Sequence, residues 1–257
     1  MRDEMFPLLI NPYTGNELRH DGDSLMDAVT EECFPIRNGI PVVLHQDAIV
    51  GLNRLYQKRY DWLGYMYDFF LQAAGPFFGA KKLFGEIAEA ISVETNDRVL
   101  ETSVGTGLQI RNLAQHGKEA RYFGLDISHG MLRKCQRNAR KWGLDLGLVQ
   151  GNAETIPFAS ETFDVVFHIG GINFFNNKGD AIREMIRVAK PGARIYVGDE
   201  TEKLLEDHPL VYLGIQQKPD GGVYEPPLRF VPESMRNIAT QEFWDGKMYL
   251  VSFQKPE

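Results

Sequence analysis

The stretch Arg98-Val-Leu-Glu-Thr-Ser-Val-Gly-Thr-Gly107 decides the fold class of this sequence. Its apolar start predicts a short buried strand, Gly105 and Gly107 predict a tight turn, and the segment 108–115 is typical of a helix. Strand, glycine turn and helix form the first unit of a doubly wound α/β sheet, which binds nucleotide-like ligands at the carboxyl ends of its strands. Glycine suits the turn because no Cβ keeps a ligand away from the backbone.

The residues around this turn exclude two common phosphate-binding loops. A dinucleotide site would place Gly or Ala at position 110, where this chain has Ile110, and the Gly-Lys-Ser/Thr of a P-loop is absent. Glu101 lies four residues before Gly105, where its carboxylate would repel a pyrophosphate and favour a cation. Asp126 ends a predicted second strand 19 residues after Gly107, close to the ~20 expected of an acid that binds ribose hydroxyls.

Five motifs follow one another in the central part of the chain. They are Glu101-x-x-x-Gly105-x-Gly107, Gly124-Leu-Asp126-Ile-Ser, Gly151-Asn-Ala-Glu154-x-Ile-Pro-Phe158, Phe163-Asp-Val-Val-Phe167 and Val188-Ala-Lys-Pro-Gly192. In this order they resemble the class I S-adenosylmethionine-dependent methyltransferases, and most of all their ubiquinone/menaquinone methyltransferase-like branch (methyltransferase type 11). The resemblance covers roughly residues 60–198. It implies an enzyme that uses S-adenosyl-L-methionine as its cofactor.

The resemblance also implies a role for individual residues in holding that cofactor. Glu101 would face the methionyl ammonium, and Asp126 would accept a hydrogen bond from each ribose hydroxyl. Ile127 and Met131 would contact the adenine, and Asn152-Ala153-Glu154, with Asn where Asp is usual, would hydrogen-bond its edge. The predicted cofactor contacts are Glu101, Thr102, Gly105, Gly107, Asp126, Ile127, Met131, Asn152, Ala153, Glu154 and His168.

Candidates for the chemistry itself lie after the fourth and fifth predicted strands. His168 and Asp199 are the candidate bases, and the sequence does not rank one above the other. Asn173, in the flexible apolar loop expected over 170–177, is a candidate for orienting a substrate oxygen. The remaining predicted substrate contacts come from the aromatic segment that precedes the glycine turn: Tyr60, Tyr65 and Tyr67.

Plainer interpretations of these residues stay open. Glu101 and Asp126 would then cap glycine turns, and His168 would be a buried, hydrogen-bonded histidine. The aromatic segment would be ordinary core, because aromatic side chains are buried more often than they bind ligands.

The chain of 257 residues fits one large domain with a small appendage. We expect a β-rich unit over 1–48 and a methyltransferase domain over 49–257, in which 49–91 form aromatic capping helices. The fold class is α/β: a Rossmann-like, seven-stranded, mostly parallel sheet with helices on both faces and a C-terminal antiparallel hairpin at Asp245-Gly246. Expected strands lie near 98–101, 121–126, 146–150, 163–169, 193–199, 238–244 and 247–253, and expected helices near 106–116, 129–142, 179–189 and 202–217.

Two capping or turn signals refine these elements. Ser128 is expected to cap the second helix of the core, and Pro191-Gly192 to stop the third and turn the chain into the fifth strand.

The string Phe34-Pro-Ile-Arg-Asn-Gly-Ile-Pro41 is similar to a small zinc-ribbon-like domain that often precedes methyltransferases of this type. In such domains two C-x-x-C pairs bind zinc. Here those positions are Asn11, Thr14, Asp27 and Thr30. Four such ligands would not hold zinc, so we expect a unit without metal whose hairpins serve as structure, and Cys33 as a small buried hydrophobe.

Composition narrows the function classes. Two cysteines favour a reduced, cytoplasmic protein, and no apolar run is long enough for a membrane span or a signal peptide. A net charge of −7 argues against nucleic acid as the partner. We expect methyl transfer to oxygen or carbon of a small, fairly apolar acceptor that is quinone-, polyketide- or lipid-like. An RNA methyltransferase and a catalytically silent partner subunit remain alternatives, and the oligomeric state stays open.

Overall fold

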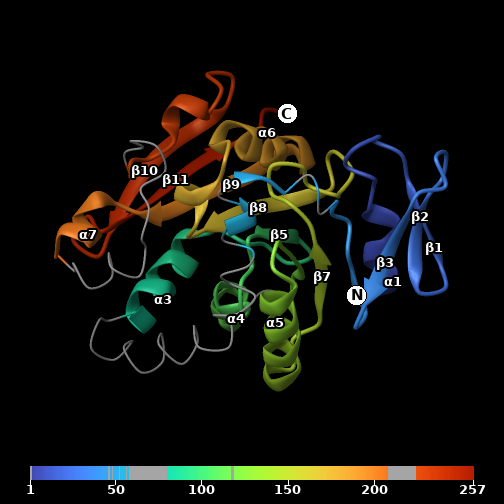
Figure 1. Cartoon of the computed structure of the whole chain (residues 1–257). Coiled ribbons are helices and arrows are strands. Elements are labelled where there is room, and N and C mark those ends of the chain that lie inside the picture. Colours follow the sequence, from blue (N-terminus) through green and yellow to red (C-terminus); the bar gives the residue numbers. More distant parts are fainter. Residues whose placement is uncertain are drawn as a thin grey trace.

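The computed structural model describes residues 2–45, 47, 49–51, 53–55, 57, 80–116, 119–207 and 224–257. They form one seven-stranded sheet with helices on both faces and a separate four-stranded antiparallel sheet beside it (Figure 1). The strand order of the large sheet is β10-β11-β9-β8-β5-β6-β7, with β5 and β8 next to each other near the middle. This arrangement confirms the predicted fold class.

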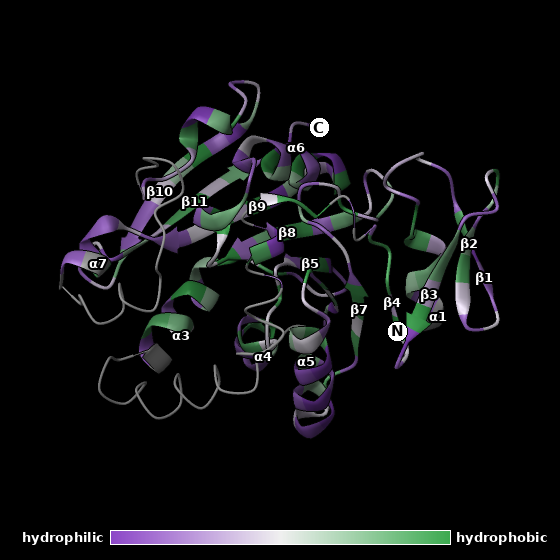
Figure 2. Ribbon diagram, viewed as in Figure 1, coloured by the Kyte–Doolittle hydropathy of each residue, from purple (hydrophilic) through white to green (hydrophobic). Residues whose placement is uncertain are grey.

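The five central strands run parallel, and the last two close the sheet as an antiparallel hairpin. The strands are β5 (Arg98–Thr102), β6 (Arg121–Asp126), β7 (Leu146–Gln150), β8 (Phe163–Ile169), β9 (Ala189–Glu200), β10 (Arg236–Phe243) and β11 (Met248–Gln254). The interiors of the parallel strands are buried on both faces, as a parallel sheet between helices requires, whereas the edge strand β10 is exposed. Figure 2 shows much of β5, β8 and β9 as hydrophobic, whereas the outer end of α5 (His129–Trp142) is hydrophilic.

Helices cover both faces of the large sheet (Figure 1). Besides α5 they are α3 (Ala80–Ala90), α4 (Leu108–Gln115), α6 (Lys178–Val188) and α7 (Glu202–Asp207), with the short 3-10 helices η3 (Ile172–Phe174) and η4 (Leu228–Phe230). Ser128 accepts a hydrogen bond from Met131 N and begins α5, so the predicted cap is confirmed. No helix in the described ranges is long and apolar enough to cross a membrane.

Two expectations for the core need correction. The strand β9 begins at Ala189, directly after α6, so Pro191-Gly192 does not form a turn between helix and strand. The pair lies inside β9, in a bulge where the register against β8 shifts between Phe163 and Val165. The segment 170–177 is also more ordered than a flexible loop, because η3 lies within it and is buried.

The N-terminal part forms its own sheet and joins the large sheet at the β7 edge. Its elements are α1 (Arg2–Met5), η1 (Phe6–Leu8), β1 (Leu18–Asp21), β2 (Ser24–Asp27), β3 (Cys33–Arg37) and β4 (Ile40–Pro41). Just after β4, Val43 N donates to Gln150 O at 2.9 Å, which continues the large sheet by a short parallel pairing. Phe34 packs in the same hydrophobic cluster as Phe123 and Phe158, so both parts share one core.

Cys33 is exposed, which contradicts the expected buried position. Side chains alternate along β3, and Phe34 takes the inward position, so the neighbouring Cys33 faces outward.

The four positions aligned with zinc ligands meet around one carboxylate. Asp27 is 1% exposed and accepts hydrogen bonds from Asn11 Nδ2 at 2.8 Å, Thr14 Oγ1 at 2.7 Å and Thr30 N at 2.9 Å. Burial by itself would raise the pKa of Asp27, but these donors, together with Val29 N, lower it well below its usual value. Charge and hydrogen bonds therefore hold these hairpins together. The relationship to zinc ribbons stays a prediction.

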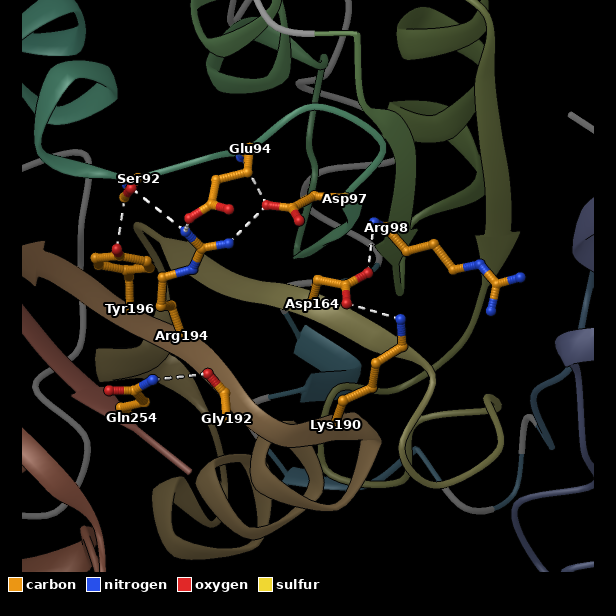
Figure 3. A network of polar contacts seen from close by, with 10 residues as sticks. All are labelled: Ser92, Glu94, Asp97, Arg98, Asp164, Lys190, Gly192, Arg194, Tyr196 and Gln254. Carbon is orange, nitrogen blue, oxygen red and sulfur yellow. Dashed lines mark hydrogen bonds and ion pairs between the residues drawn. The ribbon is translucent and has the colours of Figure 1, made fainter. Parts of the chain in front are cut away.

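Paired charges hold the amino ends of the parallel strands (Figure 3). The Arg194 guanidinium contacts Glu94 at 2.8 Å and Asp97 at 2.7 Å. The Asp164 carboxylate accepts from Arg98 N at 2.9 Å and from Lys190 Nζ at 2.7 Å. Ligands bind at the other edge of such sheets, so this network is expected to contribute stability and not chemistry.

Candidate active site

The register of the central strands brings the predicted acids to one edge of the sheet. Glu101 on β5 pairs with Gly124 on β6 and with Phe167 on β8. Asp126 at the end of β6 and His168 near the end of β8 therefore flank the end of β5. Residues far apart in the sequence meet where an open α/β sheet binds its ligands.

Asp126 holds the glycine turn in place. Its Oδ2 accepts a hydrogen bond from Gly105 N and its Oδ1 one from Ser128 N, both at 2.8 Å. A Cβ on Gly105 would meet nothing within 4 Å, so the turn is open on that side, whereas a Cβ on Gly107 would lie 2.7 Å from Cys135 Sγ. Gly107 is thus needed for packing, and Gly105 leaves space for a ligand.

Glu101 is a buried carboxyl with one unused oxygen. The side chain is 3% exposed, and the backbone N–H of Ile110 contacts it. Within the described part of the chain, no hydrogen-bond partner lies near Oε2. Burial raises the pKa of Glu101 well above its usual value, and the charge of Asp126 raises it further. Such an oxygen suits a cationic ligand, which would lower the cost of its ionisation.

His168 is fully buried beside Glu101's strand. Its Nδ1 lies 3.2 Å from Thr102 Oγ1, and Nε2 has no partner among the described residues. Burial lowers the pKa of His168 to about 4, so the imidazole is neutral near pH 7. The ring meets Phe175 edge-to-face with centroids 5.1 Å apart. A neutral imidazole that packs against an aromatic ring can orient a ligand, but it is a weak base.

Asp199 anchors the segment that contains η3. Its carboxylate is 0% exposed and accepts hydrogen bonds from Gly171 N at 3.2 Å, Asn173 N at 2.8 Å and Glu200 N at 2.9 Å. Burial raises the pKa of Asp199, while these donors and Lys178 oppose the rise. The hydrogen bonds that the Asp199 carboxylate accepts therefore hold the backbone of the segment 170–177 and of Glu200.

The Asn173 side chain is used in the same way. It is 2% exposed, with Nδ2 donating to Glu200 O at 3.1 Å and Oδ1 accepting from Lys178 Nζ at 2.9 Å. Both the nitrogen and the oxygen of the Asn173 amide are therefore hydrogen-bonded to the protein, in place of the predicted contact with a substrate oxygen.

Glu200 is an acid at this edge that the sequence interpretation missed. It ends β9, and no hydrogen bond or ion pair to its carboxylate is found in the described ranges. Burial raises the pKa of Glu200 to about 8, and the neighbouring Asp199 adds to the rise. The only signal in the sequence was an acid directly after Asp199 at a strand end.

The remaining predicted contacts fall in two groups. Ile127 is half-buried and Met131 is buried at the start of α5, next to Asp126. Asn152 Oδ1 accepts from Glu154 N at 3.0 Å, and Ala153 between them is buried. Tyr60, Tyr65 and Tyr67, like most of the predicted capping segment, lie outside the described residues.

Comparisons with known proteins agree with this geometry. A family model described as a methyltransferase domain matches residues 100–197. The chain is 30% identical over 191 residues to the ubiquinone/menaquinone biosynthesis C-methyltransferase UbiE of Klebsiella pneumoniae, covering 69% of this chain and 74% of that protein.

Two solved structures share the fold. A S-adenosylmethionine-dependent methyltransferase of Thermotoga maritima, titled a possible histamine N-methyltransferase, has a TM-score of 0.62 and 17% identity over 77% of this chain and 99% of its own. A Haloferax volcanii chain, from a complex between the Trm112 methyltransferase activator and a methyltransferase, has a TM-score of 0.60 and 18% identity over 77% and 98%. Motifs, fold and relatives together place this chain in the class I S-adenosylmethionine-dependent methyltransferases, the family of the UbiE enzymes.

Proposed function

We propose that this enzyme transfers a methyl group to carbon or oxygen of a small, fairly apolar acceptor with a quinone-like ring. The observation that carries the proposal is the aromatic ring of Phe175, which packs edge-to-face against His168 near the carboxyl end of β8 and directly follows the buried helix η3. The names of the UbiE relatives support the same class of acceptor.

The residues at the glycine turn fit the cofactor of this family. S-adenosylmethionine supplies an electrophilic methyl group when it is bound. We assign its ammonium to the unused Oε2 of Glu101 and its ribose to Asp126, with Gly105 leaving room between them. Such groups act by holding the reactants in line and keeping water out.

We assign Glu200, at the carboxyl end of β9, as the acid that takes a proton from the acceptor. A carbon or hydroxyl acceptor must lose a proton in the course of methylation. Burial raises the pKa of Glu200 to about 8, so the carboxylate form that accepts the proton becomes the major form only above that pH. Asp199 and Asn173 would shape the loop above it.

Thermal unfolding with S-adenosylhomocysteine tests the cofactor assignment, with NAD as the control. A ligand at about one hundred times its Kd adds ~2.7 kcal/mol, which raises Tm by roughly 5–11 °C for a chain of this size. Asp126→Ala should weaken binding by about 1.5–3 kcal/mol in calorimetry. A Tm that does not move with S-adenosylhomocysteine would contradict the proposal.

The acceptor is tested by methyl transfer from radiolabelled S-adenosylmethionine to three probes: a demethylated naphthoquinol, a phenol and total RNA. We expect label in the naphthoquinol, and none in RNA. Labelling of RNA alone, falling steeply as salt rises, would establish the opposite substrate class.

A further inference from the structure

The Glu154 carboxylate joins two segments that lie far apart in the sequence. Its Oε1 accepts a hydrogen bond from Asn53 Nδ2 at 2.9 Å and another from Asn177 N at 3.2 Å. Asn53 is 7% exposed, and Asn177 begins α6 at the end of the segment 170–177. One half-buried carboxylate thus contacts both the segment before the glycine turn and the segment that carries η3.

We propose that Glu154 is a positioning residue that ties the segment around Asn53 to the segment 170–177, and so closes the cofactor site. This inference rests on the methyltransferase function proposed above. The sequence resemblance had placed Glu154 at the adenine edge, whereas here its oxygen is held by protein donors.

One further hydrogen bond joins the same two segments. Asn176 Nδ2 donates to Val50 O at 2.9 Å. The neighbouring Gly51 has φ +55°, a backbone conformation that favours glycine, and a Cβ there would lie 2.5 Å from the Asn176 side-chain oxygen. The tie at Glu154 is therefore accompanied by a direct hydrogen bond between the two segments.

The segment also reaches the residues assigned to adenosine. Gln57, 8% exposed, donates from Nε2 to Ile127 O at 3.1 Å, and Gln150 Nε2 donates to the same carbonyl at 3.0 Å. Ile127 directly follows Asp126. Gln57 and Asn53 therefore contact both ends of the predicted adenosine site, at Ile127 and at Glu154.

The other partner, the segment 170–177, is fixed from its far side by Asp199, through Gly171 N and Asn173 N. It therefore connects the acceptor side of the site to the tie at Glu154. Methyl transfer needs a site closed to water, and closing segments commonly govern ligand release. Loss of the hydrogen bonds at Glu154 should therefore loosen the segment beside the cofactor and the segment beside the acceptor together.

Three variants test the tie: Asn53→Ala, Glu154→Ala and the double variant, with Glu154→Gln as the conservative replacement. Hydrogen exchange of the backbone over 172–177 is followed in the cofactor-free protein, and the dissociation rate of S-adenosylhomocysteine by stopped flow. Each alanine variant should raise both rates about tenfold. The double variant should exceed neither single one by much, because the two side chains act through one contact.

Glu154→Gln should behave like the unchanged protein, because its amide oxygen still accepts both hydrogen bonds. The matched control is Gln136→Ala. It removes another amide contact between separate segments, from Gln136 Nε2 to Asn38 O at 3.2 Å, away from the site. That variant should leave both rates unchanged.

The proposal fails if Asn53→Ala leaves exchange over 172–177 unchanged. It also fails if Glu154→Ala speeds dissociation whereas Asn53→Ala does not, which is the result expected of a direct adenine contact. A protein that shows the exchange effects but binds no S-adenosylhomocysteine would refute the cofactor assignment and leave the tie between the segments as a structural contact alone.

Discussion

Two buried carboxylates in this molecule have opposite surroundings. Asp27, in the N-terminal sheet, is 1% exposed and Glu101, at the end of β5, is 3% exposed. Asp27 accepts hydrogen bonds from five donors in its own unit, and its pKa is lowered despite its burial. Burial raises the pKa of Glu101, and its Oε2 lacks a partner among the described residues.

The difference separates a structural acid from the acid that we propose binds the cofactor. A buried charge that is fully hydrogen-bonded stabilises the fold that surrounds it. A buried carboxyl with an unused oxygen costs stability, and such groups gather at functional sites. Loss of Asp27 should therefore destabilise the protein without changing cofactor binding, and loss of Glu101 should weaken cofactor binding without destabilising the protein.

The largest effect on stability is expected from Asp27→Ala. The buried Asn11 amide would lose one of its two acceptors, and Thr14 and the backbone N–H groups of Val29 and Thr30 would lose their bond to this carboxylate. We expect Tm to fall by roughly 5–10 °C, with the affinity for S-adenosylhomocysteine unchanged when measured below the transition. Asp21→Ala, at an exposed position of β1, is the control. A similar fall in both variants would remove the special role of Asp27.

Glu101→Gln should weaken S-adenosylhomocysteine binding by about 10- to 150-fold, because it removes a charge-assisted contact to the ammonium. The same variant should raise the Tm of the cofactor-free protein by roughly 2–6 °C at neutral pH. Calorimetry and thermal unfolding measure the two effects. Glu89→Gln, with a side chain 68% exposed on α3, is the matched control. A variant that binds normally would mean that Glu101 only caps the turn.

The raised pKa of Glu101 also predicts how cofactor binding depends on pH. The free protein keeps the carboxyl protonated above its ordinary range, whereas an ammonium needs the carboxylate, so binding releases a proton. Affinity for S-adenosylhomocysteine should therefore rise with pH as pH rises above the ordinary carboxyl range. Calorimetry in phosphate and in Tris should give different binding enthalpies, and this difference should vanish in Glu101→Gln. Equal enthalpies in both buffers for the unchanged protein would argue against proton release.

Stability should follow pH in opposite directions at the two acids. The contribution of Asp27 is complete above its unfolded pKa of about 3.9 and is lost as pH falls below it. Glu101, with a raised folded pKa, destabilises the fold increasingly as pH rises above its unfolded value of about 4.3. The gain in Tm of Glu101→Gln should therefore grow with pH, and the loss in Asp27→Ala should shrink in acid. Tm measured against pH for both variants checks the signs.

The smallest effect is expected from removing one of the donors around Asp27. Thr14→Val deletes the hydroxyl that donates to Asp27 Oδ2 at 2.7 Å and keeps the shape of the side chain. One hydrogen bond to a charged group is worth about 1.5–3 kcal/mol at most, and the four other donors remain, so we expect a fall in Tm of only a few degrees. Thr14→Ser, which keeps the hydroxyl, should be close to neutral. Equal losses in both variants would mean that the methyl group matters and the hydrogen bond does not.

The sequence by itself determined the strand–turn–helix unit, the approximate positions of the parallel strands and the hairpin at Asp245-Gly246, and its resemblance to a known family indicated the enzyme class. These features depend on local apolar periodicity, on glycine turns and on motif spacing, which neighbouring residues specify. The Ser128 cap is of the same kind, because its acceptor and donor lie three residues apart.

Only the tertiary structure decided which polar groups are hydrogen-bonded within the protein and which stay available to a ligand. Asp199 is committed to the backbone of the segment 170–177, and Glu154 to Asn53, a residue 101 positions away. The outward position of Cys33 and the bulge at Pro191-Gly192 likewise depend on which strand lies alongside. A hydrogen bond between distant segments leaves no periodic trace in the sequence, because its two partners meet only when the sheet has formed.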